Sequence, residues 1–148
     1  MMIGLAGMVM AMASAAPQAG MVHSVRIDHA TGAVQSDYNA DVQVTYRQVG
    51  TVGAGGRPST LRCMWHAGLV VDRQARHASG STLVRSFAHD NVVEGSRPGW
   101  CSAQQTAIAR EVAARTPELQ ARLVQLAQED HGVLHTEIDR MQENRQAG

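Results

Sequence analysis

The chain contains no lysine, and all 13 of its basic residues are arginine. This absence excludes a lysine nucleophile, a Schiff-base lysine and the lysine of a phosphate-binding loop. The 13 basic residues are balanced by 13 acidic residues, so the formal net charge is zero. This balance gives no indication of a nucleic-acid partner or of a polybasic membrane anchor.

Motifs for catalysis or cofactor binding are also missing. The sequence has neither a C-x-x-C redox motif nor the G-x-S-x-G of a nucleophile elbow. The glycine-rich stretch "GAGGRPS" lacks the lysine and the following helix of a phosphate-binding loop, so we interpret it as a flexible turn. We therefore expect no cofactor and no catalytic residue. The alternatives are a small hydrolase with His66 or His89 in a cleft, and a metal-binding protein.

No apolar run is long enough to span a membrane, and the longest, residues 3–16, has about 14 residues where roughly 20 are needed. "ASA" at positions 13–15 supplies the small residues that a signal peptidase requires. We therefore predict a signal peptide at 1–15 and one domain at 16–148. The processed protein is expected in the periplasm or outside the cell, without a stable membrane anchor.

Cysteine and tryptophan are rare, and they occur together. The chain has two of each, and Cys63 lies near Trp65 while Cys101 follows Trp100. Two cysteines in an exported chain usually pair, and a zinc site needs more closely grouped ligands. The pattern predicts a Cys63–Cys101 disulfide packed between the two indole rings.

The periodicity of apolar residues changes once along the chain. Alternation of period two predicts strands at 22–29, 40–52, 61–72 and 81–88, and Val92 and Val93 extend the sheet region 22–94. Helical periodicity follows over 101–146, with Thr116 as a cap and Pro117 in the first turn. Short connections between the strands favour antiparallel pairing. We expect an α+β fold, in which a meander of four to five strands precedes C-terminal helices.

Two groups of polar residues are candidate sites. Arg57 and Arg97 lie in two "RP" loops, each before a cysteine, and two converging guanidinium groups can hold a carboxylate or a phosphate; the alternative is two ordinary turns. His131, His135 and Asp139 recur every four residues, a spacing that places three potential metal ligands on one helix face. Gly132 follows the first histidine, where the zinc-protease motif requires glutamate.

The last part of the chain predicts a contact with a partner. A continuous helix from Pro117 to Arg145 is about 43 Å long, more than a compact domain of this size accommodates. We expect its far end to overhang the sheet and to expose Leu134, Ile138 and Met141, so that a second copy or another protein covers them. These observations favour an exported, non-catalytic binding or assembly module of the cell envelope.

Overall fold

A computed structural model describes residues 20–147. It has four strands followed by two helices, which confirms the α+β fold class. The elements are β1 (Met21–His29), β2 (Gly32–Val49), β3 (Arg62–His77), β4 (Thr82–Pro98), α1 (Cys101–Ala114) and α2 (Thr116–Ala147). The predicted signal peptide at 1–15 lies outside the described residues.

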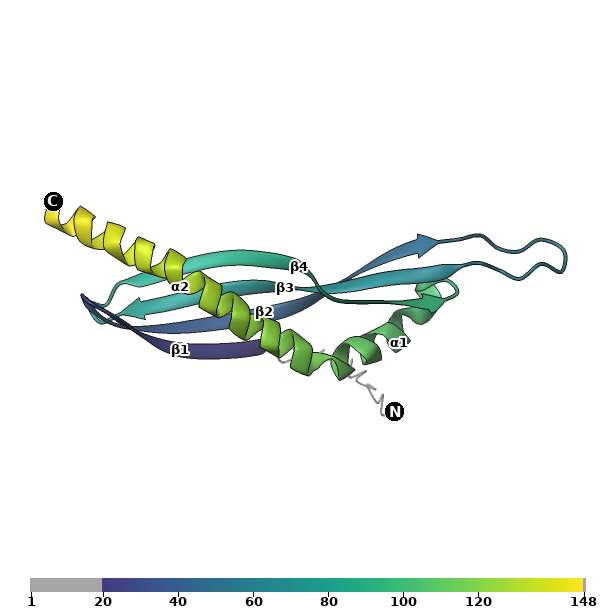
Figure 1. Ribbon diagram of the computed structural model, residues 1–148, viewed down its shortest axis with the longest axis horizontal. Coiled ribbons are helices and arrows are strands. Elements are labelled where there is room, and N and C mark those ends of the chain that lie inside the picture. The colour runs from purple at the N-terminus through teal and green to yellow at the C-terminus, as the bar shows by residue number, and fades with distance from the viewer. Residues whose placement is uncertain (1–19, 148) are drawn as a thin grey trace, which may run out of the picture.

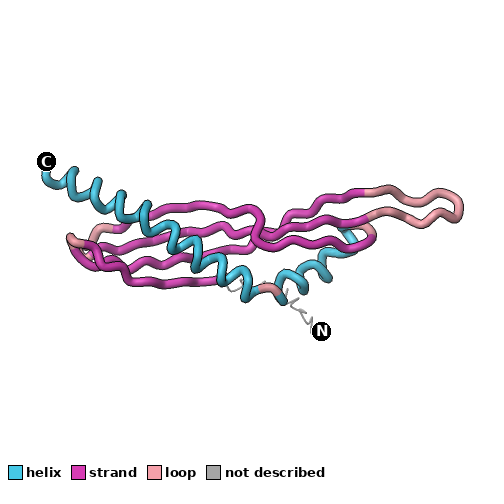
Figure 2. The backbone as a smooth tube through the Cα atoms, viewed as in Figure 1, coloured by secondary structure: helices cyan, strands magenta, loops and turns pink. Residues whose placement is uncertain are grey.

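The strands form one antiparallel sheet in the order β1-β2-β3-β4, so each strand pairs with its neighbours in the chain (Figure 1). Short turns join β1 to β2 and β3 to β4, whereas a longer loop after β2 extends beyond the end of β4 (Figure 2). This meander is the topology that the short connections predicted, because parallel pairing would need long crossovers.

Three of the strands are longer than the sequence indicated. β2 begins at residue 32 rather than 40, β3 continues to 77 rather than 72, and β4 continues to 98 rather than 88. The added stretches contain polar residues at inward positions, such as Arg73 and His77, both buried. Buried polar groups interrupt the apolar alternation from which strands are recognised, and the predicted strands therefore ended too early.

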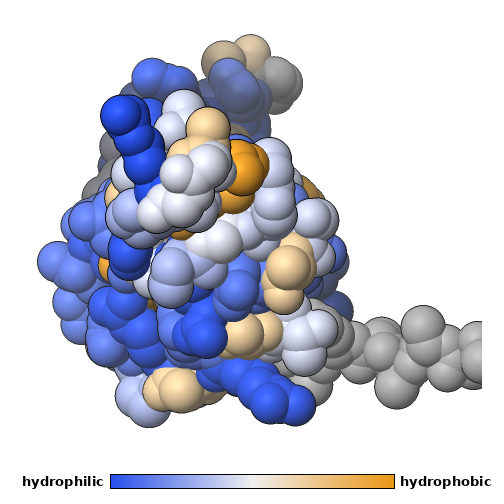
Figure 3. All heavy atoms as spheres, turned by 90° about the vertical axis from the view of Figure 1, so that its right-hand side faces the viewer, coloured by the Kyte–Doolittle hydropathy of each residue, from blue (hydrophilic) through white to orange (hydrophobic). Residues whose placement is uncertain are grey.

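Within the described residues, the helices cover one face of the sheet. α1 and α2 pack on the face that contains the buried odd-numbered residues of β3, from Cys63 to His77. The other face is open and carries mostly polar side chains. Seen from the end with the long loop, hydrophobic surface is confined to small, separated areas (Figure 3).

The pairing of β3 with β4 shifts at an irregularity between Ala67 and Leu69. Gly68 lies at this point, and a Cβ atom added there would come within 2.5 Å of the carbonyl oxygen of His89. Glycine is therefore required by the close approach of two backbones.

α2 runs unbroken through Gly132, as predicted, and crosses the sheet diagonally (Figure 1). The expected cap at Thr116 is wrong, because its hydroxyl donates to the carbonyl oxygen of Ala113, 2.7 Å away. The expected exposure of the far end is also wrong, since Leu134 and Ile138 are fully buried. The sheet extends beneath the helix because the strands are longer than predicted.

The core has two parts. The larger part lies under α1 and the first half of α2, and includes Trp65, Leu69 and Leu123. The smaller part lies under the second half of α2 and includes Leu134 and Ile138. Val42 and Tyr46 lie on the helix-covered side of the sheet, opposite Leu69 and Trp65, but each is 37% exposed, so the core does not extend fully over this end of β2.

Within residues 20–147, no helix combines the length and the apolar character needed to cross a membrane.

Candidate functional site

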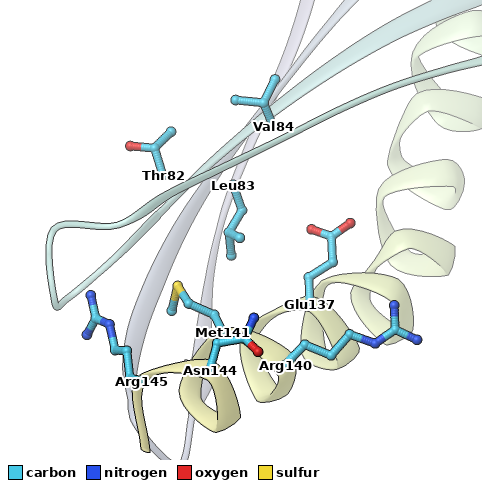
Figure 4. A pocket seen from close by; sticks show the side chains of 8 residues that line it. All are labelled: Thr82, Leu83, Val84, Glu137, Arg140, Met141, Asn144 and Arg145. Carbon is cyan, nitrogen blue, oxygen red and sulfur yellow. The ribbon is translucent and has the colours of Figure 1, made fainter. Parts of the chain in front are cut away.

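A groove lies between the first residues of β4 and the last turns of α2 (Figure 4). It has a volume of about 620 Å³. Leu83 points from β4 towards Met141 on the helix, and these two half-buried side chains give the groove an apolar part. In the sheet formed by residues 20–147, β4 is an edge strand, because its one strand partner there is β3. The groove therefore lies beside backbone groups that are available to a further strand.

The polar side of the groove is rich in arginine. Arg140 and Arg145 line it from α2, and neither forms a salt bridge with a carboxylate of the described residues. Arg145 donates a hydrogen bond to the Ser81 hydroxyl, 2.8 Å away. Glu137 also lines the groove, but its carboxylate accepts a hydrogen bond from the buried Arg73. The two arginines thus give the groove an uncompensated positive charge.

Beneath the groove, a cluster of charged groups is buried between the sheet and α2. Asp130 is only 2% exposed, and its carboxylate accepts three hydrogen bonds. The donors are the Tyr38 hydroxyl at 2.7 Å, Arg73 Nη1 at 3.0 Å and Arg85 Nη1 at 2.5 Å. Arg73 is fully buried and also contacts Glu137. Each buried charge has a partner of opposite sign, as desolvation requires.

This environment alters the acidity of Tyr38. Burial raises the pKa of its hydroxyl, and the hydrogen bond to Asp130 and the negative charge of that carboxylate raise the pKa further. The neutral phenol is therefore the stable form in the folded protein.

A second polar network joins two hairpin turns to α2. The β1–β2 turn reads His29-Ala30-Thr31-Gly32, and the β3–β4 turn reads His77-Ala78-Ser79-Gly80. In both turns the histidine Nδ1 accepts the backbone N–H two residues later, at 3.1 Å. The hydroxyl of that residue lies 2.7 Å from Nδ1 in the first turn and 2.8 Å in the second. The two turns are therefore alike in sequence and in hydrogen bonding.

The hydrogen bonds of this network have a definite direction. Because Nδ1 of each histidine accepts an amide hydrogen, the neutral ring carries its proton on Nε2. His77 Nε2 then donates to the Thr31 hydroxyl at 3.1 Å, and that hydroxyl donates to His29 Nδ1. His29 Nε2 donates to the carboxylate of Asp139 on α2, at 3.0 Å. The series links both turns to the helix.

A hydroxyl, an imidazole and a carboxylate in series also occur in nucleophilic triads. Here, however, the Thr31 oxygen accepts from His77 while its hydrogen is donated to His29, and His29 Nδ1 already accepts an amide hydrogen. These bonds occupy the groups that a nucleophile and its base would use. We interpret the network as structural: its hydrogen bonds hold the two hairpin turns against α2.

The three candidate metal ligands on α2, which are His131, His135 and Asp139, have different environments. Asp139 is bonded to His29, and the His135 ring lies 5.1 Å from the His29 ring. His131 has a buried Nε2 without a hydrogen-bond partner among the described residues. In residues 20–147, no group of three or more His, Cys, Asp or Glu side chains is arranged to hold a metal ion. Metal binding by the stripe stays an untested alternative to the prediction that there is no tight zinc site, and zinc titration of the metal-stripped protein decides between them.

The two arginines of the "RP" motifs have different environments. Arg97 lies in β4 rather than in a loop, and its guanidinium contacts Glu111 at 2.5 Å and Gln104 at 2.8 Å. Arg57 is exposed in the long loop between β2 and β3. Since Arg97 is already neutralised by a carboxylate, joint anion binding stays a prediction without support from these contacts.

The histidines of the hydrolase alternative lie near the bulge. His66 is on the open face and lines a cavity of about 150 Å³ together with Thr45 and Asp90. His89 Nε2 lies 3.3 Å from Arg122 Nη2 on α2. The small cavity at His66 is the feature that supports the hydrolase alternative.

The disulfide Cys63–Cys101 is present and joins the start of β3 to the start of α1. Trp65 is buried beside Cys63, as predicted, and its ring covers Gly95. The predicted packing of Trp100 is wrong, because this residue is 52% exposed. Trp100 is the N-cap residue of α1 and is not part of the core that contains Trp65. A disulfide is consistent with an oxidising compartment outside the cytoplasm.

Sequence reasoning missed most of the groove and both polar networks. One signal was present, since the repeated H-A-[ST]-G motif marks two equivalent turns. The buried cluster had no such signal, because Arg73 and Asp130 are 57 residues apart in the chain. Comparison with known protein families, curated proteins and solved structures finds no match for this chain.

Proposed function

We propose that this protein is an exported, non-catalytic binding module that holds an extended acidic segment of a partner protein in the groove between β4 and α2. The observation that carries the proposal is the pairing of a free strand edge with two arginines that lack carboxylate partners among the described residues. Export is supported by the disulfide and by the signal-like sequence at 1–15.

The groove offers three kinds of contact to such a segment. The free edge of β4 can pair with the peptide backbone, which supplies affinity without regard to sequence. Leu83 and Met141 can contact an apolar side chain of the peptide. Arg140 and Arg145 can bind carboxylates through two parallel hydrogen bonds. Alternating apolar and acidic residues match these contacts, because side chains of a strand alternate in direction.

Fluorescence anisotropy with two labelled octapeptides tests the proposal. We expect the alternating peptide (Val-Glu)₄ to bind, and (Val-Lys)₄ to bind at least tenfold more weakly. The double variant Arg140→Glu/Arg145→Glu should lose binding of the acidic peptide. Arg110→Glu, an exposed arginine on α1, is the control and should bind normally. Equal binding of both peptides, or equal loss in the control, would refute the assignment.

The hydrolase alternative rests on the cavity that contains His66, Thr45 and Asp90. It predicts turnover of a chromogenic ester that is lost in His66→Ala while the peptide affinity of the groove is unchanged. The binding proposal predicts no difference in turnover between the two proteins.

A further inference from the structure

Among residues 20–147, half of β2 is paired on one side only. β1 pairs with β2 from Gly32 to Ala40, whereas β3 pairs with it from Val34 to Val49. The segment Asp41–Val49 therefore has one strand partner among the described residues, and in Figure 1 it forms a margin of the sheet. Its Gln48 side chain accepts the Cys101 N–H at the start of α1. Unpaired edges of this length are rare because they invite pairing with another strand.

The sequence of this segment is complementary to itself in antiparallel pairing. When two copies are aligned with Val44 opposite Val44, Asp41 of each copy lies opposite Arg47 of the other. The same alignment places Val42 opposite Tyr46, and Gln43 opposite Thr45. Two opposite-charge pairs and two aromatic–aliphatic pairs result, which are favourable combinations between neighbouring strands.

The charged, aromatic and aliphatic side chains that would pair are exposed, and Asp41 lies beside Gly20, just before β1. Val42 and Tyr46 are each 37% exposed although they lie on the helix-covered side. Asp41 and Arg47 are exposed on the open side, and neither forms a salt bridge within the described part of the chain. Apolar pairs would thus gather on one face of the joined sheet, and charged pairs on the other.

The alignment is specific. A shift that places Thr45 at the centre puts Asp41 opposite Val49 and Arg47 opposite Gln43, so both charge pairs are lost. A shift that centres on Gln43 puts Asp41 opposite Thr45. Only the alignment centred on Val44 satisfies both charges.

From this complementarity we infer that a second copy of the chain pairs with β2 along Asp41–Arg47, giving a two-fold dimer with a continuous eight-stranded sheet. The two-fold axis passes between the two Val44 residues, perpendicular to the sheet. This interface lies on β2, at the opposite edge of the sheet from the groove on β4. It is a different surface from the C-terminal helix, for which the sequence had predicted self-association.

Exchange of the charges tests the interface. Sedimentation equilibrium of the full chain should give twice the monomer mass. Asp41→Arg alone places four arginines around the axis, and Arg47→Asp alone places four aspartates there. Each single variant should dissociate at least tenfold more readily than the wild type. Circular dichroism confirms that each variant is folded.

Mixing the two single variants provides the decisive result. In a mixed dimer, the arginine at 41 of one chain faces the aspartate at 47 of the other, and the native Arg47 faces the native Asp41. We expect the mixture to recover dimers that neither variant forms alone. A monomeric wild-type chain at high micromolar concentration, or a mixture that does not recover dimers, overturns the inference.

The register has its own test. Val44→Cys should form an intermolecular disulfide on mild oxidation, because the two positions face each other on the axis. Val42→Cys is the matched control and should cross-link poorly, since its counterpart is Tyr46. Equal cross-linking of both variants would overturn the register.

Discussion

Replacement of Asp130 by asparagine tests the buried charge cluster most directly. The substitution preserves the size of the side chain and removes one negative charge. Arg73 then remains fully buried with only Glu137 as its acidic partner. The amide also brings two N–H donors to a place where three donors already converge. In either orientation, the NH₂ group faces a donor rather than an acceptor.

The expected cost follows from the burial of the cluster. Removing one partner of a buried ion pair typically destabilises a protein by about 3–5 kcal/mol. Small domains have total stabilities of about 5–15 kcal/mol, so this loss is a large fraction. With a urea dependence of about 2 kcal/mol per molar, the unfolding midpoint should fall by roughly 1.5–2.5 M.

Urea unfolding with the disulfide intact measures this change. Asp28→Asn is the matched control, because it makes the same chemical change at a side chain that is 90% exposed on β1. Its effect should stay within about 0.5 kcal/mol. The double variant Arg73→Met/Asp130→Leu removes both charges and should be more stable than Asp130→Asn. A loss below about 1 kcal/mol in Asp130→Asn would refute the reasoning.

Three further predictions concern other parts of the fold. In Tyr46→Phe the remaining tyrosine is Tyr38, whose raised pKa keeps it protonated in the folded state while the unfolded chain ionises near pH 10. Stability should therefore fall as the pH rises above about 10, and tyrosinate absorbance should appear only with unfolding. Reduction of Cys63–Cys101 should lower the free energy of unfolding by about 4 kcal/mol, and intact mass in non-reducing conditions should show no free thiol. Gly68→Ala should lower the melting temperature by several degrees, because its Cβ meets backbone that cannot move aside.

The fold class could be predicted because it depends on local patterns. Alternation in β3 placed Cys63 and Trp65 on one face, and the change of period marked the start of the helices. The disulfide followed from the number of cysteines and from the signs of export. These inferences needed no knowledge of which strand lies beside which helix.

The lengths of the strands and the candidate site could not be predicted in the same way. From the sequence alone, Arg73 is expected at the surface. It is buried because Asp130, which lies on α2 in the helical layer, neutralises its charge. The groove exists because α2 crosses β4 at a particular angle, and no local pattern specifies that angle. The wrong expectation that Ile138 is exposed has the same origin. Ile138 is buried against a part of the sheet that was not predicted, because polar residues at inward positions interrupt its apolar alternation.

The disulfide also has a mechanical consequence. Cys63 and Cys101 are 38 residues apart in the chain, yet their Cα atoms are separated by only 4.8 Å. Fully extended, 38 residues would span roughly 130 Å. When the molecule is stretched by its two ends, tension passes through the sulfur–sulfur bond and bypasses the β3–β4 hairpin. The chain between the two cysteines cannot extend until the disulfide is reduced. The redox state therefore sets the maximum length to which the molecule can be stretched.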